Sequence, residues 1–419
     1  MTQKDFKRYM RRGLGRCYTY LRDSNDADRY KKIVLWGCLH NLSYDIQVEG
    51  TRAAYVYSLA KLYSDDDYFV SPIINKFNNL PKSQYVYREF ANLCDLLALF
   101  AEGGNREALV ALDEKRNEYL ESLVVKRSFR SYDYLRDRFE RISVSMLGLK
   151  DKIELISDFG RLFIENKHYN ADEFDWFIFR LNEYYGKSRI KSLLKNESKK
   201  NGSVAAFFDS YKKISDPDVR KRLKRLSDVD AEELVDRLLA ETDPEKKADI
   251  LFLIRFKKNI PARVHGDIIQ YARSEDSKLS ERALYALTYC RSDAVYDFAL
   301  SILDSDKNTE AVEMLLMNYR PEIDARLFEI IKSYEIDYDS TYDWHSVTSA
   351  VIAASDAGAR IPKKYLLYVY ENTLCSYCRN NAVTALSKRR WLSSDIIEEC
   401  RYDSNDETVA YINRYHKNK

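Results

Sequence analysis

From residue 236 to the C-terminal end, apolar side chains recur at the spacing of one helix face, in blocks separated by short polar turns. The block at 293–306 follows the i, i+3, i+4, i+7, i+8 pattern of an amphipathic helix. Its stripe consists of Val295, Phe298, Ala299, Ile302 and Leu303. Residues 280–290 carry a similar stripe, and the alternation typical of strands is scarce. The pattern therefore predicts consecutive helices that each bury one face.

The connection between these two helices is short, because only Arg291, Ser292 and Asp293 separate the two stripes. A tight connection favours antiparallel packing, so 280–290 and 293–306 are expected to form a helical hairpin. Similar pairs of blocks recur at 309–334, 345–373 and 380–402. Small residues mark equivalent positions in the first helices at separations of 28 to 39 residues: Ala248, Ala283, Ala311, Ala350 and Ala382. The pattern indicates a helical repeat of irregular period.

Residues that start or stop helices support this interpretation. Asp243 precedes Pro244, which places a capping carboxylate before a proline suited to the first helical position. In the N-terminal third, helical spacing occurs at 51–77 and 88–125. Gly103-Gly104 predicts a stop between two helices of the second block.

These helix pairs share small residues in the first helix, an Asp-led turn and an amphipathic second helix. In this they resemble HEAT or armadillo-like α-solenoid repeats over roughly residues 30–125 and 230–415. The resemblance is one of pattern, since HEAT repeats carry no diagnostic motif. It implies an all-α fold, an α-solenoid of antiparallel hairpins wound into a right-handed superhelix, with a concave face lined by the second helices.

Charge distinguishes the middle of the chain from its two ends. Residues 151–186 are rich in acidic and aromatic side chains, whereas the basic segment 187–225 holds thirteen basic and four acidic residues, a net charge of +9. The polar stretch 196–203 has the composition of a loop or linker. We therefore expect an N-terminal helical array at 1–125, an irregular, charge-segregated helical middle at 126–230 and a C-terminal array at 231–419.

The 419-residue chain has 68 Lys and Arg against 66 Asp and Glu, so its net charge of +2 gives no global attraction for nucleic acid or an anionic membrane. Gly and Pro number only 12 and 7, which disfavours collagen, low-complexity and turn-rich β folds. Seven scattered cysteines, an odd number, are typical of reduced intracellular thiols. The sequence shows neither the apolar core of a signal peptide nor a membrane span, so we expect a cytoplasmic protein without membrane contact.

No motif for catalysis or cofactor binding is complete. Gly186-Lys187-Ser188 matches the end of a phosphate-binding loop, but Leu181 occupies the position of its first glycine. Cys375 and Cys378 have metal-ligand spacing without a second such pair. Two core thiols are the favoured interpretation, with a His or Cys brought in by the fold as the alternative. His345 follows an acidic stretch and is interpreted as part of a hydrated loop with an N-cap role. The sequence assigns no metal ligand, cofactor or catalytic residue.

Geometry favours a non-catalytic scaffold or adaptor that binds a protein or peptide on a concave solenoid face. The alternative is nucleic-acid binding through the basic segment, because clustered cations neutralise phosphates. Its candidate binding residues are Lys187, Arg189, Lys191, Lys195, Arg220, Lys221, Arg222, Lys224 and Arg225. The preceding acidic segment is expected to compete for these cations within the chain.

A third hypothesis is enzymatic. Helical repeats with aromatic residues beside carboxylates resemble the HEAT-like alkylpurine DNA glycosylases, which act on damaged bases. Asp175-Trp176 and Asp343-Trp344 have the required composition, but no motif identifies a catalytic residue.

Overall fold

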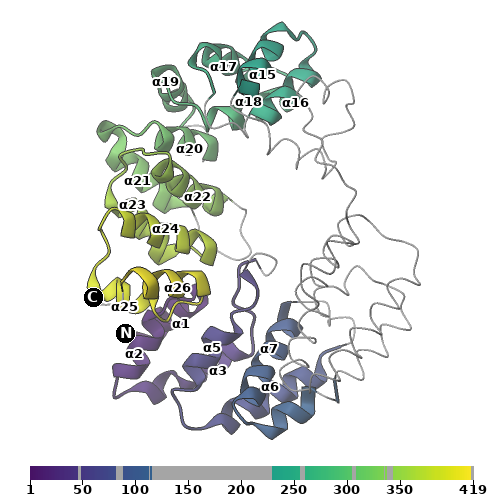
Figure 1. Cartoon of the computed structure of the whole chain (residues 1–419), viewed down its shortest axis with the longest axis vertical. Helices are drawn as coiled ribbons and strands as arrows, with labels where there is room; N and C mark the ends of the chain where they lie inside the picture. Colours follow the sequence, from purple (N-terminus) through teal and green to yellow (C-terminus); the bar gives the residue numbers. More distant parts are fainter. Residues whose placement is uncertain are drawn as a thin grey trace, which may run out of the picture. The chain divides into compact units, whose positions relative to one another are not determined.

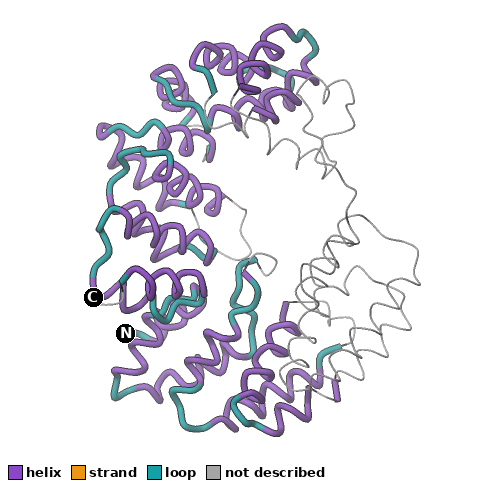
Figure 2. Tube along the Cα trace, in the orientation of Figure 1, coloured by secondary structure: helices purple, strands orange, loops and turns teal. Residues whose placement is uncertain are grey.

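The computed structural model describes residues 1–45, 49–81, 88–112, 114–115, 229–254, 260–303, 308–334, 336 and 343–416. In this part of the chain the regular structure is helical and contains no strand (Figures 1 and 2). The predicted all-α class is therefore confirmed. All the described residues belong to one compact unit. The three-segment division stays a prediction, because nearly all of the predicted middle segment lies outside the described residues.

The N-terminal part of the described chain consists of short helices, and two of them, α1 and α6, have a side-chain cap at the N-terminus. They are α1 (Gln3–Arg12), α2 (Arg16–Asp23), the 3-10 helix η1 (Ala27–Tyr30), α3 (Lys31–Cys38), α5 (Ala53–Ala60), α6 (Asp66–Asn79) and α7 (Arg88–Glu102). The side chain of Thr2 accepts a hydrogen bond from the backbone of Asp5 and so caps α1. Helix α7 ends at the predicted glycine pair, where Gly104 has a φ of +97° that disfavours other residues.

The C-terminal helices follow one another closely along the chain. They are α15 (Val229–Ala240), α16 (Pro244–Ile254), η3 (Ala262–Val264), α17 (His265–Ala272), α18 (Ser277–Leu287), α19 (Asp293–Ile302), α20 (Thr309–Met317), η4 (Pro321–Ile323), α21 (Asp324–Ser333), α22 (Asp343–Asp356), α23 (Lys363–Asn372), α24 (Ser376–Lys388), α25 (Ser394–Cys400) and α26 (Asp406–Tyr415). Helix α16 starts at Pro244, and Asp243 accepts a hydrogen bond from the backbone of Glu245. The predicted capping signal is thus confirmed.

The C-terminal helices form a series in which the even-numbered helices pack on one another and each also packs on an odd-numbered neighbour. Successive even-numbered helices contact one another along the series α16, α18, α20, α22, α24 and α26. Contacts also join α15 to α16, α17 to α18, α19 to α20, α23 to α24 and α25 to α26. Each helix in this series therefore buries its apolar face against more than one neighbour.

The hairpin pairing predicted from the apolar stripes is wrong at 280–306. Helices α18 and α19 share few or no close contacts, whereas α18 packs on α17 and α19 packs on α20. Their connection is held by Asn318 at the end of α20, whose side chain bonds the backbone nitrogen of Ser292 at 3.0 Å and the carbonyl of Cys290 at 2.9 Å. The two stripes are real, but α18 packs mainly on α16 and α17, whereas α19 packs mainly on α20.

The apolar core extends along the contacts between the even-numbered helices. Leu287, Leu315 and Val351 are fully buried on successive helices of the even-numbered series. In the described residues, no helix is both long enough and apolar enough to cross a membrane. The predicted cytoplasmic location stays a prediction.

The two ends of the described chain pack against each other, with α2 in contact with α25 (Figure 1). Arg379 on α24 binds both carboxylate oxygens of Asp403, at 2.7 and 2.8 Å, and both side chains are buried. The same guanidinium donates to the carbonyls of Arg12 and Gly13 at the end of α1. The backbone of Ser404 also donates to the Gly13 carbonyl at 2.9 Å. We call this contact between residues 1–60 and 343–416 the terminal junction.

Two glycines allow the backbones to approach at the terminal junction. A Cβ on Gly13, whose φ is +76°, would lie 2.0 Å from the hydroxyl of Ser404. A Cβ on Gly15 would lie 1.8 Å from the carbonyl oxygen of Glu399. No side chain fits at either position without displacing α25 or the segment that follows it.

Candidate functional site

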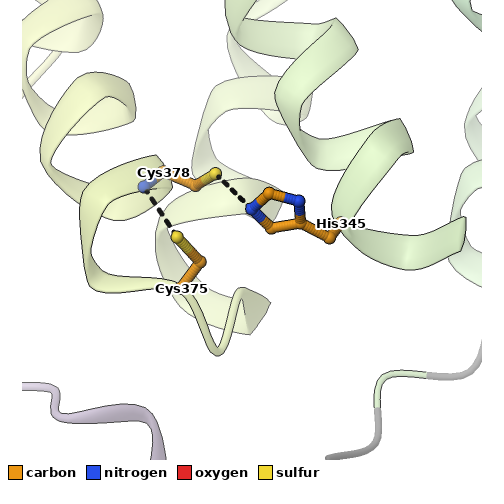
Figure 3. Close-up of side chains that lie close together, drawn as sticks. All are labelled: His345, Cys375 and Cys378. Carbon is orange, nitrogen blue, oxygen red and sulfur yellow. Dashed lines mark hydrogen bonds between the residues drawn. The ribbon is translucent and has the colours of Figure 1, made fainter. Parts of the chain in front are cut away.

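Three side chains with metal-binding or nucleophilic chemistry meet between α22 and α24 (Figure 3). Sγ of Cys378 lies 3.5 Å from Nε2 of His345, and the backbone nitrogen of Cys378 lies 3.5 Å from Sγ of Cys375. One candidate ligand atom from each residue can be chosen so that all three lie within 4.8 Å of one another. The described residues contain no other such group.

Local helix geometry brings the two thiols to the same place. Cys375 is the N-cap of α24, and its sulfur accepts a hydrogen bond from the backbone of the third helical residue, Cys378. A spacing of three puts the two side chains on one helix face. His345 is the third residue of α22, which packs against α24. Packing between two helices therefore completes a group that is distant in sequence.

Burial and hydrogen bonding polarise the two thiols in opposite directions. Cys375 and Cys378 are 5% and 4% exposed, while His345 is half-buried. The hydrogen bond from the Cys378 thiol lowers the pKa of Cys375, and His345 lowers it further. The same bond, together with burial, raises the pKa of Cys378. The two thiols are therefore inequivalent, and the one at the helix N-terminus, Cys375, is the more acidic.

Aromatic rings and one hydroxyl surround the cluster. The ring of Tyr44 stacks on His345 at 5.5 Å and meets Trp344 edge-on at 4.7 Å. The hydroxyl of Ser349 lies 3.5 Å from Sγ of Cys378. Trp344 is 1% exposed, and its indole nitrogen has no hydrogen-bond partner among the described residues. Two aromatic rings therefore pack against His345, and a hydroxyl lies beside Cys378.

The N-terminal part of the chain is bonded to the loop that carries the first cysteine. Glu49 accepts a hydrogen bond from the backbone of Ser376 at 2.9 Å and pairs with Arg52 at 2.9 Å. Arg52, which is 2% exposed, also donates to the carbonyls of Leu374 and Arg11. This buried pair fixes the backbone on both sides of Cys375.

The expectation for His345 is corrected. It lies inside the first turn of α22 and contacts Cys378, so it belongs neither to a hydrated loop nor to a cap. The two cysteines are buried thiols, as predicted, and the fold also brings a histidine beside them. A separation of 33 residues carries no periodic signal, and the acidic stretch before His345 suggested solvent.

The predicted nucleic-acid contacts lie outside the described residues. This applies to all nine candidate binding residues of the basic segment, to Gly186-Lys187-Ser188 and to Asp175-Trp176. Two side chains that could contact a base or a phosphate lie in the described part of the chain. Trp344 is buried in the core, and the guanidinium of Arg389 donates to the carbonyl of Ser355 at 3.1 Å.

Two tyrosines that carry basic neighbours in the sequence are also structural. Tyr365 is fully buried and donates to the carbonyl of Asp324 at 3.0 Å. Tyr370 is 1% exposed and donates to the carboxylate of Glu399 at 2.7 Å. Their rings pack in the core instead of presenting a stacking surface.

A hollow of about 690 Å³ lies beside α1, α2 and α25, next to the terminal junction. Arg16 lies in its wall and pairs with Glu399 at 3.0 Å, with Glu371 3.7 Å away. Because Arg16 is already paired, and Asp5 and Asp23 also line the hollow, its wall carries charges of both signs.

No protein-family model, curated protein or solved structure matches the chain.

Proposed function

We propose that the protein is a non-catalytic scaffold or adaptor, built as an α-solenoid of HEAT-like repeats, which binds a protein or peptide along one helical layer. The observation that carries the proposal is the contact series of the even-numbered helices α16 to α26, each of which also packs on an odd-numbered neighbour. A succession of this kind is typical of two-layer repeat proteins, in which one layer lines an extended binding face.

The exposed tyrosines support this choice of layer. In the described part of the chain, Tyr285, Tyr377 and Tyr415 expose between 38% and 61% of their surface, and they belong to α18, α24 and α26. Tyr289, just beyond α18, is 39% exposed. Tyrosine is enriched at protein interfaces because its ring buries a large area at little entropic cost. All four lie on or beside helices of the even-numbered series.

The test compares two sets of surface variants in the full-length protein. The first combines Tyr285→Ser, Tyr289→Ser and Tyr377→Ser; the matched control combines Asp297→Ser on α19 and Lys363→Ser on α23, which are exposed on odd-numbered helices. The expected result is a macromolecular partner that co-sediments with the wild type and the control but not with the tyrosine variant. Absence of any co-sedimenting partner, or equal loss in both sets, would contradict the proposal.

Nucleic-acid binding is the second candidate, favoured by the net charge of +9 on residues 187–225. Binding through phosphates weakens steeply with salt, with a log–log slope of about 0.9 per phosphate for duplex DNA. Affinity for a random duplex should therefore fall with salt and with the change of Arg220, Arg222 and Arg225 to Ser. Negligible affinity at low salt rules this candidate out and leaves the first untouched.

If binding to the duplex is observed, alkylated DNA separates it from the glycosylase-like alternative. Release of free base would indicate an enzyme, whereas simple binding yields none. The proposed scaffold predicts no release.

A further inference from the structure

We propose that His345, Cys375 and Cys378 bind one Zn²⁺ ion through Nε2 and two thiolates, with a fourth coordination position left for a ligand outside this set. The proposal is independent of the scaffold function, because it concerns how α22 and α24 are joined and not what their outer surface binds. It rests on the distances between the candidate ligand atoms, on their chemistry and on their place between two helices.

The distances are close to those of a zinc tetrahedron. Tetrahedral bonds of about 2.3 Å to sulfur and about 2.0–2.1 Å to nitrogen put adjacent S and N ligands about 3.6 Å apart and two sulfurs about 3.8 Å apart. Here Sγ of Cys378 lies 3.5 Å from Nε2 of His345, and the three ligand atoms lie within 4.8 Å of one another. Small side-chain rotations therefore suffice to bring all three to one ion.

The donor set selects among metals. Two thiolates and an imidazole are ligands that Zn²⁺ accepts readily, whereas Mg²⁺ and Ca²⁺ require oxygen ligands. The cysteines also have the Cys-x-x-Cys spacing common in zinc sites, with the first of them at a helix N-terminus. Two thiolates neutralise the charge of the ion, which removes most of the cost of burying it among aromatic rings.

The location indicates a structural effect. His345 belongs to α22 and the cysteines to the start of α24, so the ion joins two helices of the even-numbered series. Ser376, between the cysteines, is tied to Glu49 in the N-terminal part of the chain. Metal binding at this point therefore stabilises the terminal junction as well as the contact between the two helices.

Two other states of the same three residues make different predictions. In the first, the thiols and the imidazole are linked only by hydrogen bonds and bind no metal. In the second, Cys375 and Cys378 form a disulfide, which requires an S–S distance of about 2.05 Å and leaves no thiolate for an ion. Both states are outcomes that the experiment below detects.

The experiment uses the full chain, reduced and freed of metal by a chelator. Zn²⁺ is titrated in competition with a chromophoric chelator, and Co²⁺ is used as a spectroscopic substitute. We expect one ion per chain, proton release on binding, a thiolate-to-cobalt charge-transfer band and the intense visible bands of tetrahedral Co²⁺. Mg²⁺ should neither bind nor compete.

Variants assign the ligands. Cys378→Ser and His345→Asn should each weaken binding by more than about 100-fold, because loss of a group that only hydrogen-bonds to a metal ligand already costs up to about 100-fold. Cys290→Ser and His40→Asn are the matched controls, since this thiol is buried and this ring half-buried outside the cluster. The controls should bind like the wild type.

The variant His345→Cys tests the ligand assignment even if removal of a ligand impairs folding, because it keeps a metal ligand at this position. Replacing the imidazole by a third thiolate should retain the ion and increase the charge-transfer absorption relative to the wild type. The proposal is overturned if wild-type Co²⁺ shows no thiolate band, if the ligand variants bind like the controls, or if the reduced protein does not bind after a Cys375–Cys378 disulfide has been opened.

Discussion

The helices α15 to α20 and the terminal junction are held together in different ways. Helices α15 to α20 are packed mainly by apolar side chains such as Leu287 and Leu315, and the ion pairs that join them lie at the surface. The terminal junction instead contains two buried ion pairs, Arg379 with Asp403 and Arg52 with Glu49. Helices α15 to α20 thus associate through buried apolar surface, which tolerates substitution. The two ends of the described chain associate instead through a few directional hydrogen bonds and ion pairs.

The difference matters because the two kinds of contact fail differently. Loss of a buried methyl group leaves a cavity whose cost depends on local collapse. Loss of one member of a buried ion pair leaves the other charge buried without a partner. The free-energy cost of that unpaired charge exceeds the net stabilisation that the intact pair provided. We therefore expect the terminal junction to be the part of the described structure most sensitive to a single substitution.

Arg379→Met should have the largest effect. It leaves the carboxylate of Asp403 buried and removes the bonds to the carbonyls of Arg12 and Gly13. We expect a loss of about 3–5 kcal/mol in the free energy of unfolding, measured by urea denaturation. The double variant Arg379→Met/Asp403→Leu should recover part of that loss. A single variant as stable as the wild type would show that the junction does not depend on this pair.

Leu315→Ala should be the next most costly change. Leu315 is fully buried on α20, where α18, α19 and α22 meet. Removing its isobutyl group should cost about 3 kcal/mol through lost burial and the residual cavity. Leu239→Ala on α15, where the side chain is 41% exposed, is the control and should change stability by less than about 0.5 kcal/mol. Equal losses in both would contradict the apolar-core description of this region.

This contrast also explains what the sequence predicts. Periodic stripes such as the one containing Val295 and Phe298 identify helices, and Asp243-Pro244 and Gly103-Gly104 identify boundaries, because those signals are local. Which helix packs against which is not determined locally, since an amphipathic helix can bury its apolar face against either of its neighbours. The hairpin assigned to 280–306 therefore failed although both helices exist.

The same reasoning applies to the candidate site. The spacing of Cys375 and Cys378 is visible in the sequence, but His345 reaches them only through packing of α22 on α24. Arg379 is likewise indistinguishable from a solvent-facing arginine until Asp403 and the end of α1 are brought to it. Long-range polar contacts are specified by the whole fold and leave no short motif.

A carboxyl group within the apolar region offers a pH-dependent comparison. Burial, with a smaller effect of Glu310, raises the pKa of Glu313 on α20 to about 8. A raised folded-state pKa contributes stability that is complete below the unfolded value of about 4.5 and is lost as the pH rises through 8. Glu313→Gln should therefore match the wild type near the unfolded pKa and exceed it at alkaline pH, because the amide carries no charge that the folded state must bury. Thermal unfolding across this pH range measures the difference, and parallel profiles for the two proteins would refute it.

Lys278→Met should have the smallest effect and completes the comparison with Arg379→Met. The ammonium group of Lys278 on α18 lies 3.3 Å from Glu245 and 3.4 Å from Asp249 on α16, but its side chain is 45% exposed. Water screens such a pair, and ordering the side chain costs entropy, so the loss should stay below about 0.5 kcal/mol and disappear at high salt. Urea unfolding at low and high ionic strength provides the measurement. A loss comparable to that of Arg379→Met would mean that these helices, like the terminal junction, are held by charge, whereas a small, salt-sensitive loss assigns their association to apolar burial.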